Sequence, residues 1–493
     1  MPNIEIERKT LRSYGGQEMV TRRCVPDSLR TLQNALTLAR QRGWKVAFRA
    51  GGRAFDTHSL NETLVIDLGR LPGFRAIDVD PTARTVRVGA GAPWGAILRA
   101  TLAHGLVPAV MVTSSHATAG GTLSADCLSR FSPTYGKEGV HVRSFEFLKL
   151  DGTTITCSRA ENHDVFQAVI GGLGCLGLVL GIVHDLVPLK HGKQSAVLTR
   201  FVPFRGLRRL ADELVGRATA VRRTAARTRA AGRADPVQPR AISAALYMNA
   251  ARQGLLMRSH YVRGGSGRLR GTVLHQPGSL VHALLQIMSL FQWSRRIGWW
   301  FTMNVTFKKP RTYVDRMHGY TFFQDGNERI KRLGRKLGLP MGVRQQTYVI
   351  PWEPEDRAAS SQRLARFLEA ADRLLDRRKL LPSLIDVLYV PDESREGFLL
   401  SSSTGMSGFA VSIAFEKAFT GRFPKEERAL YDISRLCHAL EGRVHVVKHV
   451  FADPRAMQAR YRGLGRMIAV KNALDPERLL QSEFLRRVFP ALG

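Results

Sequence analysis

Short runs in which apolar and polar residues alternate predict several β-strands in the first 195 residues. Strands are expected over residues 45–48, 63–67, 85–91 and 145–150, and the last runs into Asp151-Gly152, a pair typical of a hairpin turn. Apolar residues spaced three and four apart predict helices over residues 26–42, with Asp27 as the N-cap, and over residues 94–104. This part of the chain therefore predicts an α+β domain.

The remaining sequence predicts a second α+β domain. Strands are expected over residues 246–263, 348–352 and 409–415, and amphipathic helices over residues 360–378 and 425–440. Residues 217–240 break this pattern because they are rich in Ala and Arg, contain Gly and Pro, and have almost no large apolar side chains. We interpret them as an exposed, mobile basic insertion.

Length and composition fit this division. A chain of 493 residues suits two domains, and a hydrophobic fraction of 44% suits a sizeable core. The five cysteines are scattered without a CxxC pair, so the sequence predicts neither a disulfide framework nor a metal site. A charged N-terminus and the lack of any run of 18 apolar residues add to an expected cytoplasmic location.

The charge is unusual, because 74 Lys and Arg against 41 Asp and Glu give a net charge of +33. Such a balance favours anionic partners, although the arginines are spread out and no specific nucleic-acid module is recognisable. In residues 280–301, Trp293, Trp299 and Trp300 surround Arg295-Arg296. This segment is either a basic aromatic helix in peripheral contact with a membrane or an ordinary helix over the active site.

Glycine-rich loops carry the candidate chemistry. Glycine lets the backbone approach a ligand closely, and successive N–H groups can then point at phosphate oxygens. Two such loops, each after an apolar strand, can close around one long anionic cofactor, and a third small-residue segment covers residues 171–179. They predict a flavin dinucleotide site with these candidate residues: Arg49, Ala50, Gly51, Gly52, Arg53, Ala54, Phe55, Thr113, Ser114, Thr118, Ala119, Gly120, Gly121, Gly177 and Val179.

These three segments, with residues 162–166 before the last, resemble the FAD-binding domain shared by the vanillyl-alcohol oxidase and p-cresol methylhydroxylase enzymes. Within that superfamily, the strongest resemblance is to decaprenylphosphoryl-ribose 2-oxidase and its relatives, through residues 120–144, 344–351, 442–448, 461, 475–476 and 482–486. The resemblance implies a two-domain vanillyl-alcohol-oxidase-like fold. Residues 1–195 would form the FAD-binding domain, residues 196–440 a substrate or cap domain, and residues 441–493 a segment that returns to the first domain.

The resemblance also implies roles for individual residues. Lys448 stands where that family has its active-site lysine, and His445 stands at a flavin contact, so a bulge or strand end is expected between them. Ala125 and Leu128 line the ring where relatives carry cysteine and histidine. Phe55 and Gln346 replace tyrosines of the family.

Two further replacements bear on the attachment of the cofactor. Arg53 and Ser114 occupy positions where some members link the flavin covalently through histidine and cysteine. Neither replacement supports the corresponding link, so noncovalent FAD is expected.

The expected activity is FAD-dependent oxidation of a carbinol in a sugar, polyol or related alcohol, with a phosphorylated or lipid-linked substrate favoured by the charge. Hydride would pass to flavin N5, and Lys448 or a neighbour would handle the hydroxyl proton. A second resemblance, through residues 132–136, 161–164 and 202–207, is to delta-24 sterol reductases, which reduce a C=C bond with the same FAD fold. A third alternative is a basic binding protein that retains FAD as structure.

Overall fold

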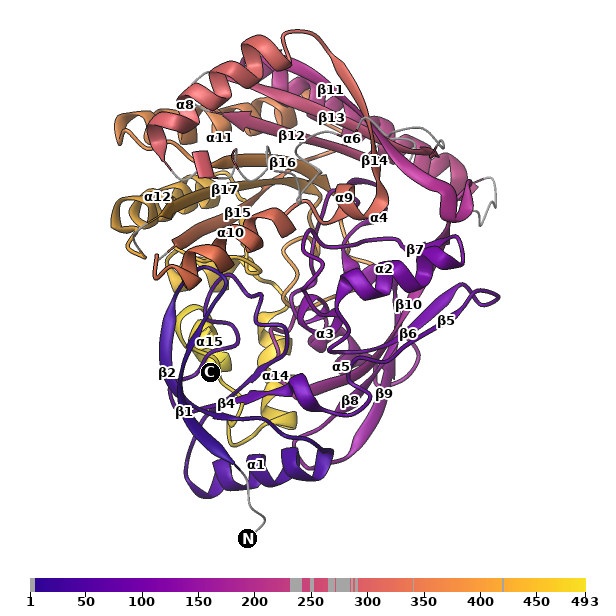
Figure 1. Ribbon diagram of the computed structural model, residues 1–493, viewed down its shortest axis with the longest axis vertical. Helices are drawn as coiled ribbons and strands as arrows, with labels where there is room; N and C mark the ends of the chain where they lie inside the picture. Colours follow the sequence, from indigo (N-terminus) through magenta and orange to yellow (C-terminus); the bar gives the residue numbers. More distant parts are fainter. Residues whose placement is uncertain are drawn as a thin grey trace.

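The described part of the chain forms three β-sheets, two smaller ones in the lower half of Figure 1 and a large one in the upper half. The computed structural model describes residues 5–230, 242–248, 252–264, 271, 284, 287, 288, 291–339, 341–418 and 421–493. This mixture of helices and sheets agrees with the predicted α+β class. Within the described residues, no helix is both long and apolar enough to cross a membrane.

The first sheet has the strand order β1-β2-β4-β3 and leads into the first glycine loop. Its strands are β1 (Ile6–Arg12), β2 (Glu18–Cys24), β4 (Leu64–Asp67) and β3 (Val46–Arg49). Helix α1 (Leu29–Gln41) confirms the predicted helix, but its cap is Ser28, whose Oγ accepts the Thr31 N–H at 3.1 Å. The predicted cap Asp27 is wrong, since it lies one residue too early and accepts only the Thr31 hydroxyl.

The second sheet is antiparallel and has the order β5-β6-β10-β8-β9, with β7 also paired to β10. Gly152, in the left-handed region at φ +91°, turns the chain from β8 into β9 and confirms the predicted hairpin. The elements of this region are β5 (Ile77–Asp80), β6 (Thr85–Gly89), α2 (Trp94–Ala103), β7 (Leu106–Pro108), α3 (Ala119–Leu123), α4 (Ser132–Tyr135), β8 (Val142–Leu148), β9 (Thr154–Ser158), α5 (His163–Val169) and β10 (Leu178–Pro188).

The large sheet has eight strands in the order β14-β11-β13-β12-β16-β17-β15-β18. It gathers strands from more than half of the chain: β11 (Ser195–Arg205), β12 (Ile242–Met248), β13 (Gln253–Arg263), β14 (Arg311–Arg316), β15 (Met341–Pro351), β16 (Leu384–Val390), β17 (Gly408–Ala418) and β18 (Arg443–His445). The predicted helices over residues 360–378 and 425–440 are confirmed as α11 (Arg357–Arg377) and α12 (Pro424–Ala439).

The predicted basic insertion is only partly correct. Residues 217–230 continue helix α6 (Leu207–Ala230), which packs on α11 through Leu214, Val215 and Ala218 on its buried side. Alanine and arginine are good helix formers, so a segment with few large apolar residues can still extend a helix that is anchored upstream. Residues 231–240 of the predicted insertion lie outside the described residues.

The two faces of the large sheet have different partners. On one face, the Tyr348 hydroxyl donates to the Leu430 carbonyl of α12 at 2.8 Å, and its ring lies 5.6 Å from Phe367 of α11. Because side chains alternate along a strand, Val349 points to the opposite face. There it packs with Leu388 and against Leu128, which comes from the first half of the chain.

The C-terminal elements join the first sheet to the large one. After β18 the chain forms α13 (Pro454–Arg460), α14 (Leu464–Leu474) and α15 (Glu483–Val488), in yellow in Figure 1. Leu480 bridges Val46 beside β3, and Asn61 donates to the Gln481 carbonyl at 2.8 Å. The loop after β18 is thereby held next to the first glycine loop.

The remaining helical elements serve as connections. They are η1 (Leu68–Arg70), η2 (Glu138–His141), η3 (Gly192–Gln194), α8 (Gln292–Phe301), η6 (Thr302–Thr306), α9 (Met317–Thr321), α10 (Asp325–Lys336) and η7 (Pro490–Leu492).

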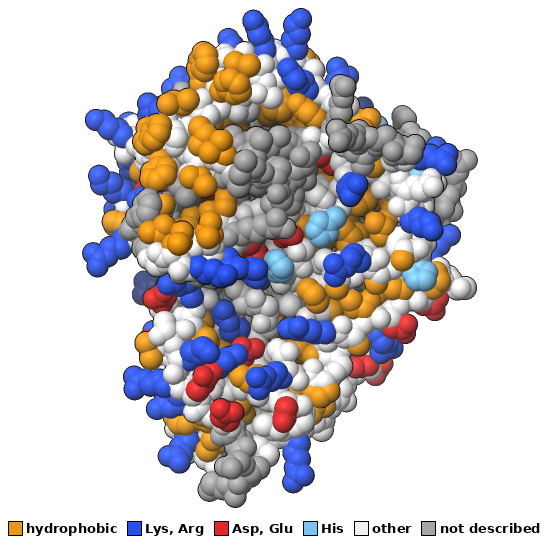
Figure 2. Space-filling view, viewed as in Figure 1, with side chains coloured by type: hydrophobic (Ala, Val, Ile, Leu, Met, Phe, Trp, Pro, Cys, Tyr) orange, Lys and Arg blue, Asp and Glu red, His pale blue; other side chains and the backbone are white. Residues whose placement is uncertain are grey.

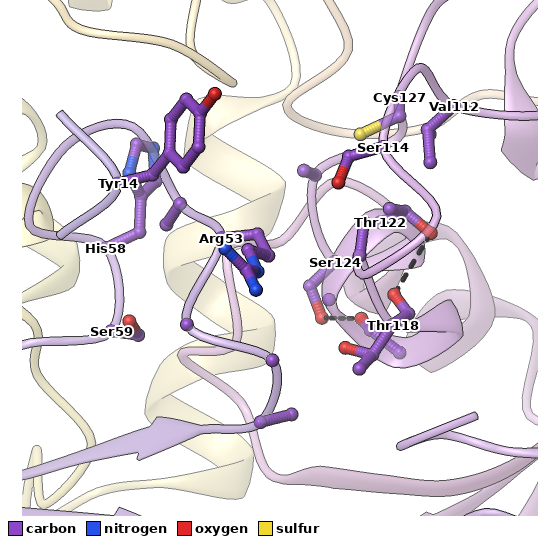
Figure 3. Close-up of a pocket in the computed structure, with 18 of the residues that line it drawn as sticks. Tyr14, Arg53, His58, Ser59, Val112, Ser114, Thr118, Thr122, Ser124 and Cys127 are labelled. Atoms are coloured by element: carbon purple, nitrogen blue, oxygen red, sulfur yellow. Dashed lines mark hydrogen bonds between the residues drawn. The ribbon is translucent and has the colours of Figure 1, made fainter. Parts of the chain in front are cut away.

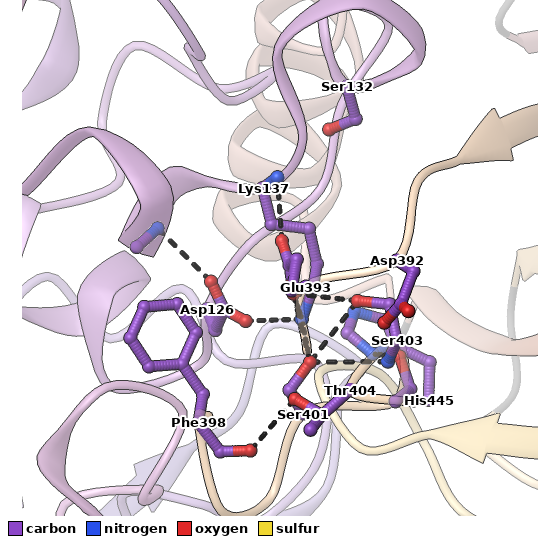
Figure 4. A network of polar contacts seen from close by, with 12 residues as sticks. Asp126, Ser132, Lys137, Asp392, Glu393, Phe398, Ser401, Ser403, Thr404 and His445 are labelled. Atoms are coloured by element: carbon purple, nitrogen blue, oxygen red, sulfur yellow. Dashed lines mark hydrogen bonds and ion pairs between the residues drawn. The ribbon is translucent and has the colours of Figure 1, made fainter. Parts of the chain in front are cut away.

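A buried ionic network ties the second glycine-rich stretch to the large sheet (Figure 4). Lys137 is fully buried, and its ammonium group contacts Asp126, Glu393 at 3.1 Å and the Ser401 hydroxyl at 2.7 Å. Ser403 donates to the same Glu393 carboxylate at 2.7 Å. Each buried charge in this network is compensated only while the others are present.

Replacing Lys137 with Met should therefore destabilise the protein by about 3–5 kcal/mol, because two buried carboxylates lose their counter-charge. Urea unfolding measures the change. The matched control is Lys149→Met, since Lys149 pairs with the exposed Asp151 and should change stability by about 1 kcal/mol or less. Equal effects of the two substitutions would contradict the assignment of Lys137 as the centre of a buried network.

Candidate functional site

A cavity of about 230 Å³ lies between the two glycine loops (Figure 3). Its lining reaches Lys448 beyond β18. Its lining runs from the first loop past the second loop to the residues after β18, which suits an elongated ligand. The first and second smaller sheets, helix α10 and the C-terminal segment all contribute to its lining.

The first glycine loop follows β3 and touches the second loop directly. A Cβ on Gly51 would lie 3.0 Å from Thr118 Cγ2 and 3.1 Å from the His116 carbonyl, so only glycine fits without displacement. Gly52 has φ +63°, which is in the left-handed region. Among the described residues, the N–H groups of Gly51, Gly52, Arg53 and Ala54 find no hydrogen-bond acceptor.

The second loop is held by polar side chains beneath it. The Thr122 hydroxyl accepts the Trp94 indole N–H at 2.9 Å and donates to Glu138 at 2.9 Å. Burial raises the pKa of Glu138 well above its ordinary value, which favours its neutral form. A Cβ on Gly120 would lie 2.7 Å from Ala90 Cβ, and the Gly121 N–H has no acceptor among the described residues.

The unpaired N–H groups of the two loops show whether a dinucleotide would fit this cavity. Two loops with unpaired N–H groups bound one elongated cavity, which suits the oxygens of a pyrophosphate. The residues present therefore fit FAD. Most of the predicted positions line the cavity: Ala50, Gly51, Gly52, Arg53, Ala54, Phe55, Thr113, Ser114, Thr118, Gly120, Gly121, Ala125, Val179 and Lys448.

Five predicted positions do not line the cavity: Arg49, Ala119, Leu128, Gly177 and His445. Arg49 turns away and donates to the Arg12 carbonyl at 2.9 Å. Ala119 and Gly177 are packed from behind, and a Cβ on Gly177 would lie 2.4 Å from the Phe147 ring. These residues lie behind the cavity wall, and the predicted contacts of these positions with the cofactor stay predictions.

The other two lie on the large-sheet side. Leu128 packs against Val349 and Leu388 of that sheet, and His445 Nδ1 lies 3.0 Å from the Ser402 hydroxyl. The predicted strand end between His445 and Lys448 is confirmed, because β18 ends at His445.

Lys448 lies at the end of the cavity, with its Nζ 3.7 Å from the centre of the Phe55 ring. Among the described residues its Nζ has no hydrogen-bond or ion-pair partner beside this ring contact. Burial lowers its pKa to about 8, and the charge of Lys331 acts in the same direction, while Cys127 and Asp386 oppose the shift. A lysine with this pKa exchanges a proton near neutral pH.

Arg53 and Ser114 both contact a residue that no sequence pattern indicates as part of a site. Glu328 of α10 is buried, and it pairs with Arg53 Nη1 at 2.8 Å and accepts the Ser114 hydroxyl at 2.8 Å. The Arg53 charge expected to contact the cofactor directly is thus shared with a carboxylate. Only the fold brings residue 328 to this loop.

Other cavity residues were also missed. Tyr14 comes from the turn after β1 and packs edge-on against Phe55 at 4.9 Å. Cys127 lines the cavity, and burial raises the pKa of its thiol well above the ordinary value. A tyrosine in a hairpin turn and a single cysteine give no sequence signal of a site.

A polar row crosses the face of the large sheet that bears Val349. Asp386 pairs in register with Ser412, Ser412 with Thr347, and Thr347 with His445. Asp386 Oδ1 is buried and has no hydrogen-bond partner among the described residues. Burial raises the pKa of Asp386, and the charges of Arg130 and Lys448 act against that shift.

Comparisons with known proteins agree with this geometry. Residues 22–158 match the family model described as an FAD binding domain. The chain is 35% identical over 149 residues to cytokinin dehydrogenase 2 of Oryza sativa subsp. japonica, an alignment that covers 29% of this chain and 26% of that protein.

Two further relatives match the chain over a similar length. L-gulonolactone oxidase of Mus musculus is 30% identical over 166 residues, covering 34% of this chain and 37% of that protein. Decaprenylphosphoryl-beta-D-ribose oxidase of Mycolicibacterium smegmatis is 32% identical over 157 residues, covering 31% of this chain and 34% of that protein. The chain thus spans well under half the length of these curated relatives. The residues that match the family model hold the two loops.

Replacing Gly51 with Val should weaken FAD binding by about tenfold or more, because the added side chain separates the two loops. Quenching of flavin fluorescence during titration of the apoprotein measures the affinity. Gly465→Val is the matched control, since a Cβ at that position in α14 meets open space. Wild-type affinity in Gly51→Val, with circular dichroism unchanged, would contradict the placement of the cofactor.

Proposed function

The chain belongs to the superfamily of FAD-linked oxidases, and on that basis we propose that it oxidises a CH–OH group of a sugar, polyol or related alcohol. The observation that carries this proposal is Lys448, a lysine without a hydrogen-bond or ion-pair partner among the described residues, with a pKa lowered to about 8, at the end of the cavity. When bound, FAD supplies a two-electron acceptor for the hydride of the carbinol carbon.

In the proposed mechanism, the neutral amine of Lys448 accepts the hydroxyl proton of the substrate as the carbinol becomes a carbonyl. Asp386, when ionised, favours the ammonium form of Lys448 that results, since its charge raises the pKa of that lysine. Phe55 and Tyr14 form the apolar wall beside the amine and keep water away from it.

We further propose that FAD is held noncovalently. Neither Arg53 nor Ser114 can form the links that some relatives make, and both are engaged by Glu328. The proposed architecture is vanillyl-alcohol-oxidase-like, with residues 1–195 as the FAD-binding domain, 196–440 as the substrate domain and 441–493 returning to the first domain.

Purified protein should be yellow and release its flavin on acid precipitation, and a panel of sugars and alcohols should bleach it under anaerobic conditions. Absorbance near the flavin maximum follows each step. Bleaching by NADPH and not by any alcohol would instead support the reduction of a C=C bond. Colourless protein that cannot be reconstituted with FAD would exclude the whole proposal, and a yellow acid pellet would contradict noncovalent binding.

Flavin reduction should accelerate as the pH rises through about 8 in the wild type, because the folded protein lowers the pKa of Lys448 and only its neutral form accepts a proton. Lys448→Met should abolish this dependence and slow reduction by about 10²–10⁴-fold, with FAD binding retained. Stopped-flow absorbance measures the rate. Lys425→Met, at an exposed helix end, is the control and should behave as wild type.

Two neighbours sharpen this test. Asp386→Asn should lower the pH at which flavin reduction accelerates, and Lys331→Met should raise it, because these two charges shift the Lys448 pKa in opposite directions. If the pH dependence of the reduction rate is unchanged in both variants, or persists in Lys448→Met, another group takes the proton.

A further inference from the structure

Helix α8 (Gln292–Phe301) has its polarity reversed relative to an ordinary surface helix. Its buried side carries Ser294 and Arg295, which are 2% and 4% exposed. Its outer side carries Trp293, Ile297 and Trp300, which are 68%, 56% and 62% exposed. A surface helix normally buries its apolar stripe and turns its charges to water.

Specific hydrogen bonds fix this orientation. The Arg295 guanidinium donates to the Leu381 carbonyl and, at 3.2 Å, to the Glu416 carbonyl at the end of β17. The Ser294 hydroxyl donates to the Phe291 carbonyl at 3.1 Å. Turning the helix over would leave a buried guanidinium without these acceptors, so the apolar side is held outward.

The exposed apolar surface extends beyond α8. We define the outer patch as Trp293, Ile297, Trp300, Phe301, Val305, Leu333 and Leu337, each at least 48% exposed. Leu333 belongs to α10 (Asp325–Lys336), and Leu337 follows directly after it. Helix α10 packs at Met341, and Met341 pairs with β17 at Ala418, close to the carbonyl that binds Arg295. Figure 2 shows the hydrophobic side chains gathered at the upper left, over α8 and toward α10.

Only basic groups accompany the outer patch along the chain. Residues 291–314 and 329–352 contain no Asp or Glu. Arg296 lies on the outer side of α8, and Arg332 and Lys336 alternate with Leu333 and Leu337 at the C-terminal end of α10 and just after it, all of them exposed. Patches of this composition, aromatic and aliphatic with a cationic rim, suit the boundary between headgroups and acyl chains.

We propose that the outer patch docks on the surface of an anionic lipid bilayer. A bilayer offers an apolar layer for the tryptophans and a negative surface for Arg296, Arg332 and Lys336. A second copy of the chain is a poorer occupant, because the basic rims of two patches would face each other in a chain with a net charge of +33. The inference rests on α8 and α10 and does not depend on the proposed oxidase activity.

Co-sedimentation of the FAD-bound protein with vesicles tests the proposal, using phosphatidylcholine alone and phosphatidylcholine mixed with phosphatidylglycerol. Binding should favour the anionic vesicles, weaken with added salt and shift tryptophan emission to the blue. Trp293→Ser/Trp300→Ser should lower the partition coefficient by about tenfold or more. Arg296→Gln/Arg332→Gln/Lys336→Gln should lower it on the order of a hundredfold, on anionic vesicles only.

Matched controls remove equal numbers of exposed groups far from the outer patch. Val20→Ser/Leu29→Ser removes exposed apolar side chains, and Arg30→Gln/Arg42→Gln/Arg75→Gln removes exposed charges. Both should bind vesicles as the wild type does. No binding to anionic vesicles at low salt, or equal losses in the controls, would overturn the proposal. A concentration-dependent dimer that Trp293→Ser/Trp300→Ser dissolves would assign the patch to a second copy instead.

Discussion

The close contact between two glycine loops is the constraint on which the candidate site depends. Gly51 lies against Thr118 and the His116 carbonyl at distances that admit no side chain without displacement. Because the loops meet there, their unpaired N–H groups lie along one cavity. The Trp94–Thr122–Glu138 chain holds the second loop from beneath, and the C-terminal bridge at Leu480 holds the strand that leads into the first. The site therefore requires both loops, the residues that support the second loop and the C-terminal bridge together.

Charge compensation decides which cations in this basic chain can do chemistry. Lys137 is neutralised by buried carboxylates, and Arg53 is paired with Glu328. Lys448 has no such partner among the described residues, so desolvation lowers its pKa instead of being offset by a salt bridge. Beneath the outer patch, the buried guanidinium of Arg295 is compensated by hydrogen bonds to backbone carbonyls, while the neighbouring Trp293 and Trp300 are exposed.

Local sequence patterns predicted much of the secondary structure correctly. The strand before the first loop, the hairpin at Gly152 and helices α11 and α12 follow from alternation, turn chemistry and apolar spacing over a few residues. The errors arose where a distant part of the chain intervened. Residues 217–230 are helical because α6 is anchored on α11, and Leu128 faces the large sheet because Val349 and Leu388 cover it.

By itself, the sequence determined the two loops, since a glycine that permits close backbone approach is a local property, visible in the residues around Gly51 and Gly120. It also indicated Lys448 through resemblance. Only the tertiary structure decided which groups surround them. Glu328 and Asp386 lie more than 200 residues from Arg53 and Arg130. Tyr14 meets Phe55 from a different strand turn, and all these contacts depend on how three sheets pack. The lowered pKa of Lys448 and the outward apolar face of α8 depend on which side chains the fold buries, and a local sequence pattern does not show that.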